Sequence, residues 1–241
     1  MSEFLAPFEA MLATLFTPAR VRAIDGGEDW SAERAEVDRS GFLDALAEEA
    51  AGGAGLSFAD VVPLWRALGA HAAPTALGDA MVERGSGDAG PARSVMLAAA
   101  ISGAADRVLA MSVEYANQRV QFGKPIGRQQ AVQQQLATMA EEVVAVRLAV
   151  DLAGASGWPT PERAALAATI AAQHAATIAN TAHAVHGAIG ISEEYDLQLY
   201  TSRLHAWRIE IGGETLAARS LGKAVLEAND STLDWVRTAL F

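Results

Sequence analysis

A pattern of apolar residues at helical spacing begins near Ala92 and continues to a corner at residues 115–130, where Gly123 and Pro125 interrupt it. A second helical pattern resumes after Gly127. Glycine tolerates the left-handed backbone that commonly ends a helix, and proline cannot continue a helix because it lacks an N–H donor. The sequence therefore predicts two long helices that are joined by a sharp corner.

Apolar residues at helical spacing recur through the second half of the chain. They predict long helices over residues 93–119, 131–153, 162–186, 195–207 and 216–227. Only 6% of the residues are aromatic although 51% are hydrophobic, and alanine, the best helix former, is very frequent. Short loops between long helices favour antiparallel neighbours. We therefore predict an all-α fold whose C-terminal part is an antiparallel helix bundle.

The first 85 residues carry shorter helical patterns, which predict a small N-terminal helical domain. Thr17, which precedes a proline, is expected to cap a helix, and Ser31 is expected to cap a stretch that extends to Leu46. Ser57 precedes a further amphipathic helical pattern. Residues 86–91 are rich in glycine and end in proline, which is typical of a linker. The predicted domains are therefore 1–85 and 92–241, joined by the linker 86–91.

Charge and composition exclude several classes of function. The formal net charge of −11 argues against nucleic acid as a partner, although a few local arginines would suffice for a phosphorylated cofactor. The absence of cysteine excludes disulfides and thiolate chemistry. His183 and His186 are three residues apart but lack a Glu-x-x-His repeat, so no metal site is expected. No signal pattern or uncharged membrane-spanning run is present, and we expect a cytoplasmic protein with no membrane partner.

Two clusters of residues each allow a structural and a functional interpretation. Arg119 and Lys124 lie on either side of Phe122, and cations are favourable near the partial negative charge of a helix C-terminus. The same Arg119 would also offer a fork to a phosphate, with Phe122 as an apolar face beside it. Gly187 and Gly190 either end a helix or let the backbone pass close to a ligand.

The corner closely resembles the C-terminal domain of the flavin-dependent acyl-CoA dehydrogenases. The family pattern is Arg-x-x-Phe-Gly-x-x-Ile followed shortly by Gln, and Arg119, Phe122, Gly123, Ile126 and Gln130 match it. In that family the Arg and the Gln hold the diphosphate of FAD and the Phe packs on the cofactor, often on the FAD of the neighbouring subunit. The resemblance therefore implies that Arg119, Phe122, Gly123 and Gln130 bind FAD.

The glycine cluster resembles a second family segment, Gln-x-x-Gly-Gly-x-Gly, which contacts the ADP part of FAD. Gly187 and Gly190 match it, whereas Ala184 stands at the Gln position and Ala188 at the second Gly. The resemblance implies Gly187 and Gly190 as further cofactor-binding residues, with a weakened grip.

The segment before Arg219 is similar to the family's apolar-x-Glu-Gly-Thr, whose Glu is the base that removes the α-proton of the acyl-CoA. A carboxylate in an apolar pocket suits this role because its pKa moves toward the working pH. Counting back from Arg219 places Gly212 at the base position, with Glu210 and Glu214 on either side as candidate catalytic residues. A minority of the family carries the base on the first long helix, at a place that corresponds to Arg93. Both usual positions therefore lack a carboxylate, and a solvated loop residue is the favoured interpretation of Glu214.

The family normally inserts a β-domain where residues 86–91 lie, and no run of alternating apolar β-branched residues occurs between residues 70 and 95. The resemblance thus implies a short member that lacks this domain, uses FAD and serves the desaturation of an acyl-CoA, steroid-derived ones included. We expect the reduced, non-catalytic subunit of a hetero-oligomer, which completes the FAD site of a full-length partner. Two alternatives stay open: a homo-oligomeric acyl-CoA dehydrogenase with Glu214 or Glu210 as its base, and a structural helical protein that has lost FAD.

Overall fold

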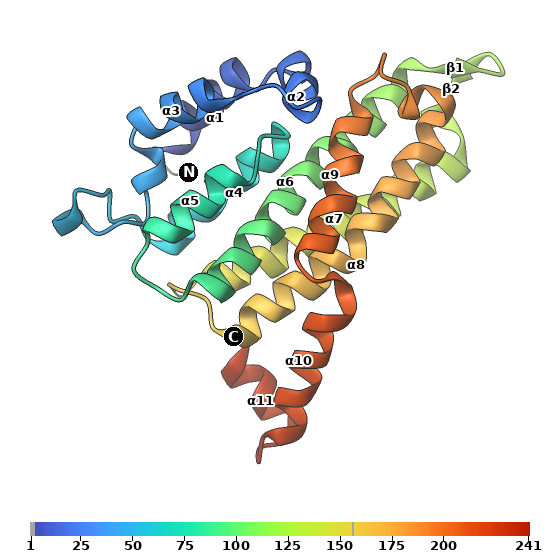
Figure 1. The fold of residues 1–241 in the computed structure, drawn as a ribbon. Helices are drawn as coiled ribbons and strands as arrows, with labels where there is room; N and C mark the ends of the chain where they lie inside the picture. The colour runs from blue at the N-terminus through green and yellow to red at the C-terminus, as the bar shows by residue number, and fades with distance from the viewer. Residues whose placement is uncertain (1–2, 156) are drawn as a thin grey trace.

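The structure is a computed structural model that describes residues 3–155 and 157–241 (Figure 1). The described residues are mostly helical, and their only strands are two residues long: β1 (Val120–Gln121) and β2 (Lys124–Pro125). The predicted all-α class and the absence of a middle β-domain are therefore confirmed for the described residues.

The long helices lie close to their predicted positions. They are α6 (Ala89–Gln118), α7 (Gln130–Gly154), α8 (Pro161–His186), α9 (Leu197–Glu210) and α10 (Gly213–Glu227). Helix α6 packs against α7, α8 and α9, so it forms the centre of the bundle (Figure 1). By length and composition α6 would also be able to cross a bilayer, but 72% of its apolar window is buried inside the protein. Its apolar residues therefore belong to the core.

The N-terminal segment contains five short α-helices and two 3₁₀ helices. They are α1 (Leu5–Leu15), α2 (Pro18–Asp25), α3 (Ser31–Arg39), η1 (Phe42–Asp44), η2 (Glu49–Ala51), α4 (Phe58–Ala70) and α5 (Ala76–Arg84). Thr17 accepts a hydrogen bond from the N–H of Arg20 at 3.3 Å, and Ser57 accepts one from the N–H of Asp60 at 3.2 Å. The predicted cap at Thr17 is therefore confirmed, and the structure adds a cap at Ser57.

The predicted cap at Ser31 is wrong. The Ser31 hydroxyl instead donates to Asp29 at 2.6 Å, and α3 ends at Arg39 rather than extending to Leu46. Gly41 has a φ of 83°, a left-handed conformation that turns the chain into η1. Apolar spacing alone did not reveal this break, because Leu46 is buried by the turn just as it would be by a helix.

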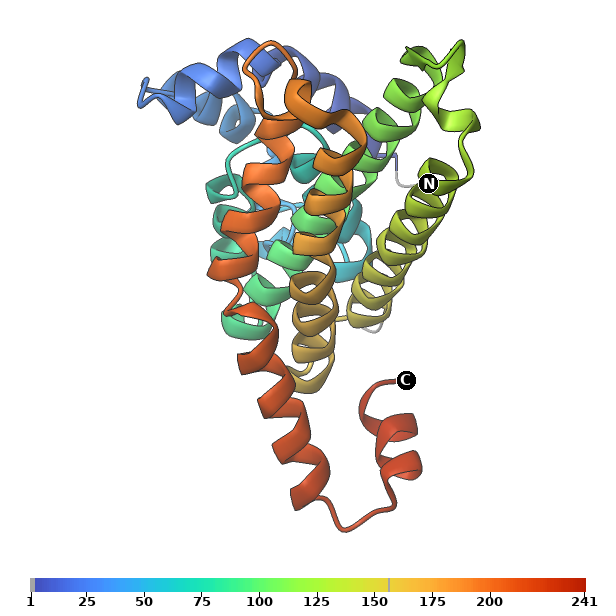
Figure 2. The same ribbon diagram turned by 90° about the vertical axis from the view of Figure 1, so that its right-hand side faces the viewer.

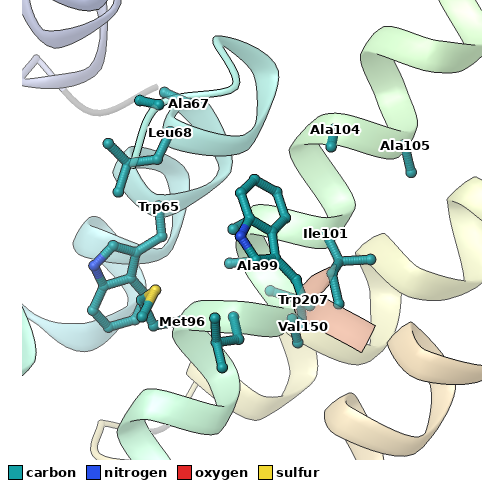
Figure 3. Close-up of a cluster of buried hydrophobic side chains, with 14 of the residues drawn as sticks. Trp65, Ala67, Leu68, Met96, Ala99, Ile101, Ala104, Ala105, Val150 and Trp207 are labelled. Atoms are coloured by element: carbon teal, nitrogen blue, oxygen red, sulfur yellow. The ribbon is translucent and has the colours of Figure 1, made fainter. Parts of the chain in front are cut away.

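One hydrophobic core extends through both segments of the chain. Trp65 and Leu68 of α4 pack with Ile101 of α6 in a cluster that also includes residues of α7 and α9 (Figure 3). Two glycines make this close approach possible. A Cβ added at Gly69 would lie 1.9 Å from the Ala100 carbonyl oxygen, and one added at Gly103 would lie 1.8 Å from the Arg66 carbonyl oxygen. The predicted division into domains 1–85 and 92–241 stays a prediction.

The connection between α5 and α6 is short and packed. Residues 85–88 join the two helices directly, and the indole of Trp158 covers the connection. A Cβ added at Gly85 would lie 2.6 Å from this ring, and one added at Gly87 would lie 2.0 Å from it. Trp158 in turn contacts Phe58, with ring centroids 5.5 Å apart. The place of the family's β-domain is thus taken by a closed junction.

The C-terminus contains a helix that the sequence patterns did not predict, α11 (Thr232–Ala239). Helix α10 continues beyond the end of the bundle, and α11 folds back beside it (Figure 2). The remaining short elements, η3 (Ile126–Arg128) and η4 (Gly187–Ile191), lie near the opposite end, where the β1–β2 hairpin is (Figure 1).

Candidate functional site

The corner between α6 and α7 is a tight β-hairpin, a detail that sequence patterns had left unspecified. Val120 pairs with Pro125, and the two turn residues have positive φ angles, 52° for Phe122 and 77° for Gly123. Two-residue hairpins favour turns with positive φ at both central residues. The N–H of Ile126 donates to the Arg119 carbonyl at 2.8 Å and closes the hairpin. The corner is therefore a defined projection and not merely a loop between helices.

Phe122 stands at the tip of the hairpin with 90% of its surface exposed. A bulky residue at positive φ is strained, by roughly 1–2 kcal/mol. Exposure of the ring also forgoes the roughly 1.5–3 kcal/mol that burial of such a side chain provides. Neither cost serves the packing of this chain. The geometry leaves an aromatic face exposed at the tip of the hairpin.

Three cations belong to the same corner of the chain as Phe122. Arg119 precedes β1, Lys124 lies in β2 and Arg128 ends η3, and no described acidic group forms an ion pair with any of them. The sequence contains no acidic residue between Glu114 and Glu141, although the chain as a whole has a formal net charge of −11. The corner is therefore a local positive region on an acidic protein, which suits a phosphate ligand.

Gln130 begins α7 beside these cations and is exposed. The preceding residue, Gln129, is the N-cap, and its side chain makes no capping hydrogen bond. The first N–H groups of a helix lack partners within the helix, and the helix dipole makes this end positive. Arg119, Phe122, Gly123 and Gln130 are thus brought together at one end of the bundle, in an arrangement that can hold an anion and an aromatic ring.

The segment with Gly187 and Gly190 reaches the same end of the bundle. Gly187 has a φ of 64° and ends α8. A Cβ added at Gly190 would lie 2.9 Å from the Cβ of His186 and 3.1 Å from Leu197, so packing within the chain already requires a glycine there. The structural interpretation accounts for Gly190. A role of either glycine in cofactor binding stays a prediction.

Sequence patterns missed an aromatic cluster beneath this segment. The ring of His186 stacks on Tyr115, with centroids 4.5 Å apart, and Tyr195 lies 5.2 Å from His186. His186 is buried and its Nδ1 lies 2.8 Å from the Ala182 carbonyl oxygen; burial lowers the pKa of His186. The cluster joins α6, α8 and the segment before α9. In the sequence, only the position of His186 on the apolar face of the predicted helix indicates that its side chain is buried.

The two candidate bases are both held in ion pairs. The carboxylate of Glu214 accepts from Arg208 at 2.9 and 2.8 Å. Its own backbone N–H and the Arg208 guanidinium lower the pKa of Glu214 below its usual range. Glu210 pairs with Arg93, which also donates to Asp79 at 2.8 Å. A general base for an acyl-CoA needs the opposite environment, in which an apolar pocket raises the pKa of the carboxylate.

Neither of the two positions that correspond to the family's base can supply a carboxylate in this chain. Gly212 has a φ of 95°, and a Cβ there would lie 3.0 Å from Leu216, so a side chain at this position is strained. Arg93 links α5, α6 and α9 through Asp79 and Glu210. Burial raises the pKa of Asp79, and Arg93 opposes this shift. The hairpin follows the end of α6, whereas Arg93 lies near the start of this helix, so most of the length of α6 separates the hairpin from the ion-pair cluster.

No group of three or more metal-ligating side chains lies together among the described residues. The corner, with its cations and exposed aromatic ring, is therefore the candidate binding site. The fold and the corner together define a class: an all-helical bundle protein that presents an exposed aromatic ring and unpaired cations at one end.

Comparison with known proteins identifies the family within this class. The family model for the acyl-CoA dehydrogenase C-terminal domain matches residues 92–226, which is more than half of the chain. The chain therefore belongs to the acyl-CoA dehydrogenase family, whose members use FAD.

Three similar proteins illustrate how much of the chain is shared. Acyl-CoA dehydrogenase IpdE2 of Mycobacterium tuberculosis is 42% identical over 112 residues, which are 46% of this chain and 35% of that protein. The chain thus spans about a third of the length of this relative. A chain of the ChsE4-ChsE5 complex from Mycobacterium tuberculosis superposes with a TM-score of 0.83 at 19% identity, over 95% of this chain and 99% of that one. A chain of the Tcur3481-Tcur3483 steroid ACAD G363A variant gives a TM-score of 0.80 at 19% identity, over 93% and 98% of the two chains. At 19% identity these two structures establish only a shared fold. That fold covers nearly the whole of this chain and nearly the whole of each matched chain.

Proposed function

We propose that this chain is the reduced, non-catalytic subunit of an FAD-dependent acyl-CoA dehydrogenase and that it completes the FAD site of a full-length partner subunit. The complex would desaturate the α,β-bond of an acyl-CoA thioester. The observation that carries this proposal is the hairpin corner, where Phe122 is exposed in a strained turn among three unpaired cations.

The residues at the corner fit the diphosphate and ring parts of FAD. Arg119 would bind the diphosphate in a fork and Gln130 would donate its amide to the same group, while Phe122 would pack on the cofactor. FAD, when bound, accepts the hydride that leaves the β-carbon of the acyl-CoA. Lys124 and Arg128 add positive charge that favours the cofactor's phosphates. Because the corner points away from this chain, the cofactor would be shared with the partner.

The environments of the candidate bases support the non-catalytic role. The carboxylate of Glu214 forms an ion pair with Arg208 and has a lowered pKa, and Glu210 forms an ion pair with Arg93. Gly212 has a backbone conformation that disfavours a side chain. In the proposed complex the partner subunit therefore supplies the base that removes the α-proton, and its β-domain covers the flavin.

The similar proteins support both a hetero-oligomer and a steroid-derived substrate. Two of the solved structures that share the whole short fold are assemblies of two named components, and one of these is described as a steroid ACAD. We therefore propose that the partner is a full-length acyl-CoA dehydrogenase subunit and that the acyl group of the substrate is derived from a steroid.

The test compares the chain alone with the chain co-expressed with each full-length acyl-CoA dehydrogenase of the source genome. A visible spectrum would report bound flavin, and light scattering would report the size of the assembly. We expect a yellow mixed oligomer with acyl-CoA dehydrogenase activity only after co-expression. A chain that by itself is yellow and turns over acyl-CoA would overturn the proposal, and loss of that activity in Glu214→Gln or Glu210→Gln would then identify an autonomous base.

A further inference from the structure

The last residues of the chain form a structure that has little contact with the rest of the protein. Helix α11 and the turn before it, residues 228–241, are named here the C-terminal arm. The arm extends beyond the end of the bundle (Figure 2), and neither α10 nor α11 contains a fully buried residue. The arm is nevertheless an ordered helix and not an extended tail.

The sequence of the arm specifies the start of this helix. The N–H of Asp234 donates to the Ser231 hydroxyl oxygen at 3.2 Å, and the Ser231 hydroxyl donates to Asp234 at 2.6 Å. Such a cap contributes about 1 kcal/mol to a helix. Helices as short as α11 are marginal in water without tertiary packing, however. A capped but nearly unpacked helix of this length therefore needs an additional surface to lie on.

One side of α11 is apolar. Leu233, Val236 and Leu240 follow one another at spacings of three and four residues, and Phe241 comes next. Leu240 is only 8% exposed, but Leu233 is 59% exposed and Phe241 is 73% exposed. This pattern of apolar anchors is typical of a helix that lies in an apolar groove of another protein.

The arm lies along the same edge of the molecule as the hairpin corner. In Figure 2 the β1–β2 hairpin, α7 and α11 follow one another down the right-hand side of the protein. Helix α7, which separates the two ends, has 25 residues and is therefore roughly 38 Å long. Two of its apolar residues, Val144 and Leu148, are exposed. The edge thus carries uncovered apolar groups at both ends and in the middle.

We infer that the C-terminal arm is a docking helix, which binds with its apolar side in a groove on the helical bundle of the full-length dehydrogenase partner. This inference rests on the proposed function, which places that partner at the hairpin end of the same edge. The arm would supply a second, distant contact with the same body, and two linked contacts strengthen each other. A second copy of this chain is the less favoured occupant, because it would bring together two chains with a formal net charge of −11 each.

The experiment introduces the same residue on the two sides of α11 in the intact, co-expressed chain. Leu233→Glu places a charge on the apolar side, and Thr238→Glu places it on the polar side; both positions are exposed. We expect Leu233→Glu to weaken the complex with the partner by roughly tenfold or more, because buried apolar anchors dominate binding, and Thr238→Glu to change it by less than about twofold. Biolayer interferometry would measure the affinity, and thermal unfolding of each chain alone would verify that the fold is retained.

The outcomes separate this inference from the proposed function. If the wild-type chain and Leu233→Glu bind the partner equally well, the arm has no docking role, while the proposed function stands. If the wild-type chain binds no dehydrogenase, the proposed function fails and the docking role fails with it. If the wild-type chain instead forms a homodimer that Leu233→Glu dissociates, the occupant is a second copy and the inference is wrong.

Discussion

The two halves of this chain treat their apolar residues differently. In the described part of residues 1–112 the large apolar side chains are buried or half-buried, whereas the exposed ones, from Val113 near the end of α6 to Phe241, all lie beyond residue 112. The residues up to 112 belong to a core that they share with α7, α8 and α9. Beyond residue 112 these three helices each contribute one face to that core, whereas α10 and α11 contain no fully buried residue, and apolar groups stay uncovered at the corner, along α7 and on the arm. This contrast supports the proposal that the part beyond residue 112 is the side that meets a partner.

The sharpest test of the packing within residues 1–112 is at the contact between α4 and α6. Gly103→Ala would place a Cβ 1.8 Å from the Arg66 carbonyl oxygen, and we expect it to destabilise the protein by about 3 kcal/mol, because the helices must separate. Gly222→Ala, in α10, is the matched control: a Cβ there meets nothing within 4 Å. It should be neutral or stabilise by about 0.5–1 kcal/mol, since alanine favours helix. Urea unfolding would measure the free energy of unfolding of both variants. Equal changes in the two variants would contradict the contrast between the packed α4–α6 contact and the uncovered α10.

The corner should behave in the opposite way. Arg119→Gln or Phe122→Ala should reduce flavin retention by the complex by about ten- to a hundredfold, because a charged hydrogen-bond fork or a stacked ring is lost. Neither change should lower the melting temperature of the chain alone, since both side chains are exposed. Arg34→Gln, an exposed arginine on α3, is the control for charge. If the Arg119→Gln complex retained as much flavin as the Arg34→Gln complex, the corner would not be part of the cofactor site.

A smaller effect is expected at the former base position. Gly212→Glu restores a carboxylate where the family carries one, but the φ of 95° strains any side chain there. We expect a loss of about 1 kcal/mol in the free energy of unfolding and no acyl-CoA turnover by the chain alone. An electron-acceptor assay would detect turnover. Activity in this variant would show that the second half retains a complete active site.

The smallest effect concerns Glu214. Because its pKa is lowered in the folded state, its pairing stabilises the protein at pH values above the usual pKa of 4.5, and this stabilisation is lost as the pH falls through the lowered value. The melting temperature of the wild type should therefore exceed that of Glu214→Gln slightly at pH 7, and the difference should shrink in acid. A difference that grows in acid would mean that the pKa of Glu214 is raised, as expected of a base.

Much of the fold could be predicted from the sequence because long helices repeat their apolar spacing many times. The predicted helix at 162–186 differs from α8 by one residue at its start. Short elements gave weaker signals. The hairpin depends on Phe122 accepting a positive φ, which residue type disfavours, and α11 has only eight residues. The stretch from Ser31 to Leu46 was misjudged because a helix and a turn can bury the same side chains.

The candidate site was predictable in part. The residues of the corner follow a family pattern, and the structure shows them exposed at one end of the bundle. Sequence did not reveal which charges were free, because ion pairs such as Arg93 with Glu210 join residues that are more than one hundred positions apart. Arg208 and Glu214 are only six positions apart but lie on different helices, α9 and α10, and the backbone N–H of Glu214 together with this pairing lowers the pKa of the carboxylate. Partnerships of this kind are set by the packing of helices and not by local spacing.

The packed junction at residues 85–88 also bears on how the chain folds. Closing a long loop costs more entropy than closing a short one, and contacts between nearby residues form sooner. Here α5 and α6 are joined by a few residues under Trp158, so their contacts are local, whereas a chain with a domain inserted at this point must bring the same helices together across that domain. We therefore expect both segments to unfold in a single cooperative transition. The short connection makes folding of the helical core independent of any strand domain.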